Sequence, residues 1–130
     1  TRAVAVDSGF VEAFLRLGAL HIDASNTAAA LDVLRQARAL APRSAEACVL
    51  LGEDCLLMAA PDSALANFDD ALDRDPTSVT AAVGRGRALF LLEDFVQAGA
   101  AFRRAIEMAP DTRDAYYFLG LAYVREVAPQ

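Results

Sequence analysis

Cysteine and histidine are the side chains in this sequence best suited to metal binding or nucleophilic chemistry. Cys48 and Cys55 are seven residues apart, and His21 is the only histidine. If both cysteines lie on one helix, the rise of 1.5 Å per residue separates their Cα atoms by roughly 10.5 Å, beyond disulfide reach. Two thiols without histidine or acidic companions at ligand spacing also make a poor metal site. We therefore predict that all three are core residues and that the chain has no metal site.

The other polar residues lack the patterns that catalysis or cofactor binding would need. A single histidine rules out a cluster built from several imidazoles, and Gly84-Arg85-Gly86 lacks the strand and the lysine of a phosphate-binding loop. The acidic pair Asp69-Asp70 is typical of a solvated helix face. We predict no catalytic residues and no cofactor, and expect that the chain is not an enzyme.

Net charge and hydropathy exclude two further classes of partner. The formal charge is −6, and all 12 basic residues are arginines. A negative field repels phosphate backbones, so nucleic-acid binding is not expected. No apolar run is long enough to span a membrane, so direct insertion is not expected either. Residues 1–10 do not resemble a targeting segment. The cysteines slightly favour the cytoplasm and leave a bacterial periplasm open, while the alanine-rich, lysine-free composition suggests a bacterial source.

The elements that position these side chains are predicted by a repeat of 34 residues. Small residues and prolines recur at this interval without insertion or deletion. The columns are Gly18, Gly52, Gly86 and Gly120; Ala30, Ala64 and Ala98; Ala37, Ala71 and Ala105; and Pro42, Pro76 and Pro110. Bulky residues follow the same step at Leu34, Phe68 and Phe102. Such columns predict close helix crossings, in which a small residue faces a large one.

Within each period the apolar spacing predicts two helices. Phe14, Leu17 and His21 fall at steps of three and four, and a second face follows with Ala30, Leu34 and Ala37. Residues 25–27 between the two helices are of types that favour turns and helix N-caps. Each proline of the repeat marks the end of a second helix.

This pattern resembles the tetratricopeptide repeat over essentially the whole chain. The motif residues of the second copy are Cys48, Leu51-Gly52, Cys55, Ala64, Phe68, Ala71 and Pro76. The resemblance implies an all-α fold, a right-handed α-solenoid of antiparallel helix pairs. We expect repeats at residues 11–44, 45–78 and 79–112. Residues 1–10 would be the tail of a preceding repeat's second helix and its turn, and residues 113–130 the first helix of an incomplete repeat.

The resemblance also implies a concave groove lined by the first helix of each pair. The groove residues that we select are Leu15, Ala19, Ile22, Val49, Glu53, Leu56, Leu57, Val83, Arg87, Phe90, Tyr117 and Leu121. Most are apolar, which suits an amphipathic helix or an extended apolar segment. Glu53 and Arg87 would pair with each other or orient the partner. Family members that grip the carboxylate end of chaperone tails use lysines and asparagines here, and this chain has no lysine.

The function predicted from the sequence is therefore a protein-interaction scaffold that binds a partner polypeptide, as part of a longer repeat protein. Two alternatives stay open. The chain could be a regulatory or substrate-recruiting segment of a larger enzyme or of an export or assembly machine. It could also self-associate through the terminal helix, because residues 116–124 carry no charge and are apolar on all sides.

Overall fold

The computed structural model describes residues 8–127, which form seven α-helices and no strand. The helices are α1 (Ser8–Asp23), α2 (Thr27–Leu40), α3 (Ala45–Leu57), α4 (Pro61–Arg74), α5 (Val79–Leu91), α6 (Phe95–Met108) and α7 (Arg113–Val127). The predicted all-α class is confirmed. The tail of a preceding repeat was expected within residues 1–10, of which residues 1–7 lie outside the described residues. Residues 8–10 belong to α1 rather than to the turn that we expected there.

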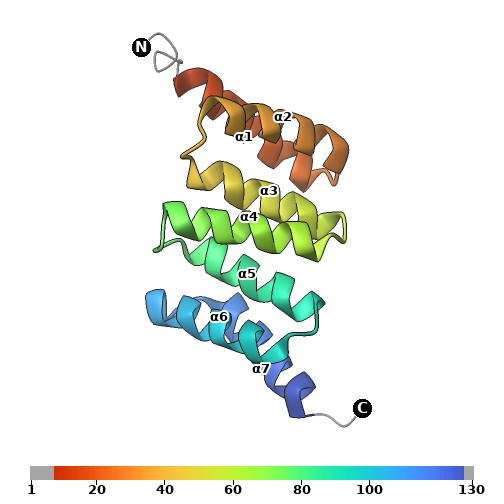
Figure 1. The fold of residues 1–130 in the computed structure, drawn as a ribbon, viewed down its shortest axis with the longest axis vertical. Coiled ribbons are helices and arrows are strands. Elements are labelled where there is room, and N and C mark those ends of the chain that lie inside the picture. The colour runs from red at the N-terminus through yellow and green to blue at the C-terminus, as the bar shows by residue number, and fades with distance from the viewer. Residues whose placement is uncertain (1–7, 128–130) are drawn as a thin grey trace.

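The helices stack as a solenoid along one axis, from α1 and α2 at one end to α6 and α7 at the other (Figure 1). Each helix contacts only helices one or two places away in the chain. No long-range closure joins the two ends within residues 8–127. The all-α solenoid is thereby confirmed, and its stability comes from interfaces between neighbouring helices.

The turn that follows each second helix recurs every 34 residues and is short and polar. Ser44 and Ser78 cap α3 and α5, with each hydroxyl accepting the backbone N–H of the residue three positions later. Pro42, Pro76 and Pro110 each lie one residue beyond the C-cap of α2, α4 or α6. Proline cannot continue a helix, so the second helix of every pair ends at the same point.

The turn from each first helix to its second helix has the same backbone geometry. Ser25, Ala59 and Glu93 have positive φ values of 59°, 56° and 65°. At Ala59, the backbone N–H donates to the carbonyl of Leu56, and the next N–H donates to the carbonyl of Cys55. These two hydrogen bonds define a Schellman motif, in which glycine is the residue usually found at the position with positive φ. The chain uses three other residue types there.

The core lies between the two layers of helices and is built from small residues facing large ones. Leu34, Phe68 and Phe102 are fully buried. The equally buried alanines are Ala30, Ala64, Ala98, Ala37, Ala71 and Ala105. Gly18, Gly52 and Gly86 each lie against the large residue 16 positions later, whereas no side chain from another described helix packs against Gly120 in this way. Cys48 and Cys55 are buried free thiols, and His21 is half-buried.

Candidate functional site

The candidate site is the surface shared by the first helix of each pair. The backbone of α3 approaches those of both α1 and α5, and α5 approaches α7, whereas the backbones of successive second helices do not come comparably close within residues 8–127. The row of helices that approach one another more closely lies on the inside of a curved stack. We call the surface formed by α1, α3, α5 and α7 the inner face, and the side of α2, α4 and α6 the outer face.

The twelve groove residues selected from the sequence differ in accessibility. Leu57, Arg87 and Tyr117 are exposed, and the half-buried members are Ala19, Ile22, Glu53, Leu56, Val83, Phe90 and Leu121. Two do not offer an open surface. Leu15 is 5% exposed and packs with Ala30 and Leu34 in the core, because α3 covers this side of α1. Val49 is also buried and contributes only the wall of a cavity. Leu15 therefore belongs to the core rather than to the groove.

Two cavities open between the first helices. One, of about 200 Å³, lies where α3, α5 and the start of α7 meet, and its lining includes Glu53, Val83, Arg87 and Asp114. The side chain of Phe68 reaches it from α4, because Gly84 has no Cβ to block the ring. The second cavity, of about 330 Å³, lies between α3 and the start of α5 and shares Glu53 with the first. The sequence did not indicate that a fully buried phenylalanine of α4 would line this cavity.

Glu53 is the central charge of the inner face. Burial raises the pKa of its carboxyl, the nearby Arg87 opposes this shift, and Asp23 adds to it. The ion pair considered from the sequence does not form among the described residues. The Arg87 guanidinium instead lies 5.4 Å from the centroid of the Phe118 ring. Glu53 is thus a partly desolvated carboxylate without a direct cationic partner.

Aromatic side chains gather where α5, α6 and α7 meet. The rings of Phe90 and Phe95 are 5.2 Å apart in an edge-to-face arrangement. The Arg125 guanidinium lies 5.0 Å from the Phe95 centroid and 5.7 Å from that of Phe90. Phe95 was not among the selected residues because it begins a second helix. Its ring nevertheless packs edge-to-face against that of Phe90, which was selected.

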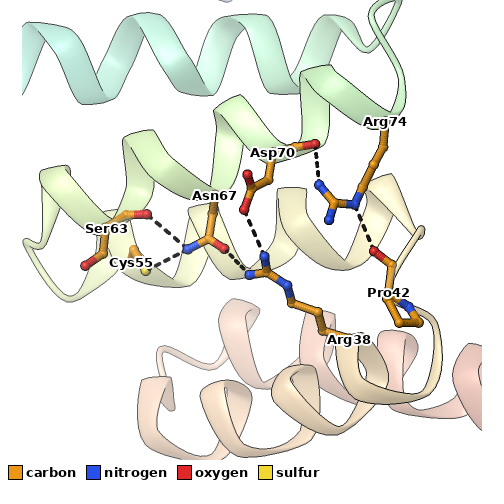
Figure 2. Close-up of polar contacts among 7 residues, drawn as sticks. All are labelled: Arg38, Pro42, Cys55, Ser63, Asn67, Asp70 and Arg74. Carbon is orange, nitrogen blue, oxygen red and sulfur yellow. Dashed lines mark hydrogen bonds and ion pairs between the residues drawn. The ribbon is translucent and has the colours of Figure 1, made fainter.

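The outer face holds a polar junction that the sequence reasoning did not identify. The Arg38 guanidinium donates to Asn67 Oδ1 at 2.9 Å and to Asp70 Oδ2 at 2.8 Å, joining α2 to α4 (Figure 2). Arg74 Nε donates to the Pro42 carbonyl oxygen at 2.8 Å. The side chains of this junction, Arg38, Asn67, Asp70 and Arg74, differ from their counterparts 34 positions away, which is the only signal in the sequence that could have revealed them.

Two kinds of site are not found in the part of the chain that the structure describes. No group of three or more His, Cys, Asp or Glu side chains is placed to hold a metal ion between residues 8 and 127. In the same range, no helix combines the length and apolar character needed to cross a membrane.

Comparison of the sequence and the structure with known proteins identifies a matching family and several solved structures of similar fold. A family model described as "Tetratricopeptide repeat" matches residues 60–111 and 92–130, which together span more than half of the chain. The protein "Superkiller complex protein 3" of Mus musculus is 36% identical over 75 residues, covering 58% of this chain. The match spans only 5% of that protein's length.

Solved structures resemble the chain over most of its length. The "First TPR of Spaghetti (RPAP3) bound to HSP90 peptide SRMEEVD" matches with a TM-score of 0.90 and 17% identity, covering 95% of this chain and 98% of that one. The structure of MamA matches with a TM-score of 0.83 and 24% identity, covering 96% of this chain and 73% of that one. At these identities the likeness shows the shared fold.

Proposed function

Because the chain belongs to the tetratricopeptide repeat family, we propose that it is a scaffold that binds a partner polypeptide along its inner face. The observation that carries this proposal is the row of accessible apolar side chains on the first helices, between which two cavities also open. Leu57, Leu91 and Tyr117 are exposed on three successive first helices, with Tyr117 65% exposed. Apolar side chains gathered along a groove are typical of a protein-interaction surface. A similar solved structure carries a bound HSP90 peptide, which supports the same use of this fold.

The chemistry of the inner face favours an apolar partner over an acidic one. Glu46, Glu53 and Asp114 line its cavities, and Arg87 is their only basic lining residue. The peptide in the similar structure, SRMEEVD, ends in three carboxylate-bearing side chains and a valine. Its carboxylates would face these acids, at a cost of several kcal/mol for like charges brought together. An amphipathic helix that places its apolar stripe on Leu56, Leu57 and Phe90 fits better.

The test combines a groove cross-linker with paired variants. A photoreactive residue in place of the exposed Leu57 identifies a bound polypeptide, and fluorescence anisotropy with a peptide from that polypeptide then measures its affinity. Leu56→Glu together with Phe90→Glu should weaken binding by at least about tenfold, because both buried contacts become charged. The control, Leu40→Glu on the outer end of α2, should bind like the parent protein. Unchanged affinity in the inner-face variant would refute the proposal.

A second function, self-association, is supported by the exposed side of α7. Tyr116, Gly120, Tyr123 and Val127 follow one another at steps of four, three and four, and Val127 is 79% exposed. In the three preceding repeats, the residue equivalent to Gly120 receives Leu34, Phe68 or Phe102. The occupant that we propose for this stripe is the same stripe of a second copy, since a large tyrosine of one copy fits beside the glycine of the other.

Light scattering over a range of concentrations tests self-association. The parent protein should shift from monomer to dimer as concentration rises, and Val127→Glu should remain monomeric. Phe10→Glu, which alters another exposed apolar residue, on α1, is the control and should dimerise normally. A parent protein that stays monomeric at every concentration would rule out this second function.

A further inference from the structure

The outer face contains a cleft of about 690 Å³ between α2 and α4, with α3 forming its floor. This volume lies within the range of pockets that hold ligands. Leu31, Leu51 and Met58 provide apolar walls, and Arg35, Arg38 and Arg74 provide charge. It lies on the opposite side of the helix pairs from the inner face. We call it the outer cleft.

The charge of the outer cleft is opposite to that of the whole chain. Three arginines line it and no carboxylate does, although the chain carries a formal charge of −6. Asp70, the acid that contacts these arginines, is already bound by Arg38 at 2.8 Å. A basic, partly apolar hollow on an acidic protein concentrates anionic partners there and repels them elsewhere.

Helix packing does not explain this composition. Every repeat has the same packing needs, so residues required for packing recur at the 34-residue step. Arg38 and Arg74 do not recur, and Arg35 has an arginine counterpart only two steps later, at Arg103 on α6. Their counterparts at the junction of α4 and α6 are Asp69, Leu72 and Met108. The family fold forms there without any of the three arginines, so the basic cleft is an addition to the fold.

Two of the arginines are fixed in place while the third is available. Arg38 is held by Asn67 and Asp70, and Arg74 Nε and Nη1 donate to the carbonyls of Pro42 and Asp70 (Figure 2). Arg35 is exposed and makes no hydrogen bond or ion pair with any residue that the structure describes. It lies one helical turn before Arg38 on the same face of α2. Its guanidinium can therefore donate two parallel hydrogen bonds to an incoming carboxylate.

We propose that the outer cleft binds an acidic peptide segment in which carboxylate-bearing and apolar side chains alternate. A glutamate or aspartate of the peptide accepts from Arg35, and its apolar neighbours rest on Leu31, Leu51 and Met58. A free inorganic anion would use the charge but leave the apolar walls unused. The mixed lining therefore favours a peptide, and this site is separate from the inner-face surface proposed above.

Fluorescence anisotropy with three labelled octapeptides tests the outer cleft. The probes alternate leucine with glutamate, with glutamine or with lysine. The glutamate peptide should bind best, and raising salt from about 50 mM to about 200 mM should weaken its binding because salt screens the exposed arginines. Arg35→Gln should weaken it about tenfold, the loss expected when one charged hydrogen-bonding partner is removed. The control, Arg104→Gln on α6, should remain within about twofold of the parent protein, and circular dichroism checks that both variants fold.

Four results would each overturn the proposal. The first is equal binding of the lysine peptide, and the second is an unchanged affinity in Arg35→Gln. The third is displacement of the glutamate peptide by inorganic phosphate as readily as by unlabelled peptide, which would indicate a simple anion site. The fourth is loss of binding in the double variant Leu56→Glu and Phe90→Glu, which would place the peptide on the inner face.

Discussion

The aromatic ring of Phe102 occupies the space that a Cβ atom on Gly86 would need, since such an atom would lie 2.5 Å from the ring Cε1. Real Cβ atoms essentially never approach other heavy atoms so closely. The same relationship joins Gly52 to Phe68, where the closest approach would be 2.7 Å. Each glycine therefore allows a large residue of the second helix to pack directly on the backbone of the first.

Gly86→Ala should destabilise the protein by about 1–3 kcal/mol, because the ring of Phe102 must move within a filled core. Gly120→Ala, at the equivalent position of α7, would place its Cβ more than 4 Å from every described atom outside the adjacent backbone of α7 and the two neighbouring residues. It should instead stabilise the protein by roughly 0.8–1 kcal/mol through better helix propensity. Urea denaturation of both variants measures the two opposite effects. Equal free energies of unfolding for Gly86→Ala and the parent protein would contradict the close packing.

A second prediction concerns Asp54, a carboxylate in the core of α3. Its side chain is 0% exposed, and neither oxygen has a hydrogen-bond partner. The counterparts of Asp54 in α5 and α7 are Ala88 and Ala122, which are fully buried. Asp54→Ala should raise the free energy of unfolding at neutral pH by about 1–3 kcal/mol, because it removes an unpaired buried polar group. A thermal melt in which the variant unfolds before the parent protein would show that Asp54 has a stabilising partner.

The pH dependence of stability follows from the same carboxyl and from Glu53. Burial raises the pKa of Asp54 above its ordinary value of 3.8. It also raises that of Glu53 above 4.5, against the opposing charge of Arg87. Between these ordinary values and the raised ones, the folded state binds more protons than the unfolded state, so stability from these groups falls as pH rises.

Acidifying the parent protein through this window should therefore increase the contribution of both groups to the free energy of unfolding. The window lies above 3.8 for Asp54 and above 4.5 for Glu53. Urea titrations at several pH values, compared between the parent protein and Asp54→Ala, isolate the Asp54 part. The variant should show a smaller gain on acidification. Identical pH profiles for the two proteins would contradict the prediction.

The fold could be predicted from the sequence because its determinants repeat. Small residues at constant spacing are needed wherever two helices cross closely, so the positions of Gly52, Ala64 and Phe68 revealed both the period and the helix pairs. Arg85, next to Gly86 in the glycine column, also contacts a neighbouring helix, since its Nε lies 2.7 Å from Asp69 Oδ1. The repeat columns and the Arg85 contact each involve only one helix and the helices next to it in the chain.

The features that sequence reasoning missed are those that differ between repeats. Arg35 and Arg38 form part of the outer cleft only because Arg74, more than thirty residues away, lies across from them. The accessibility of Leu15 depended on how closely α3 covers α1, which spacing along one helix does not reveal. The polar junction is marked in the sequence only by departures from the repeat pattern, such as Leu72 in the position equivalent to Arg38.

The last prediction concerns the turn at Ala59, whose φ of 56° is unfavourable for a residue with a Cβ atom. The left-handed conformation costs an L-residue roughly 1–2 kcal/mol, while glycine adopts it freely but gains about 0.5–1 kcal/mol of unfolded-state entropy. Ala59→Gly should therefore stabilise the protein by about 0.5–1 kcal/mol in urea denaturation.

Ala41 provides the matched control for this turn, since it also lies between helices but has a φ of −135°. Ala41→Gly relieves no strain and should lose about 0.5–1 kcal/mol through unfolded-state entropy alone. The two alanine-to-glycine changes should thus have opposite signs, although both are in turns. The same substitution at Glu93, with a φ of 65°, should behave like Ala59→Gly. Destabilisation by both Ala59→Gly and Glu93→Gly would show that these turns are not strained.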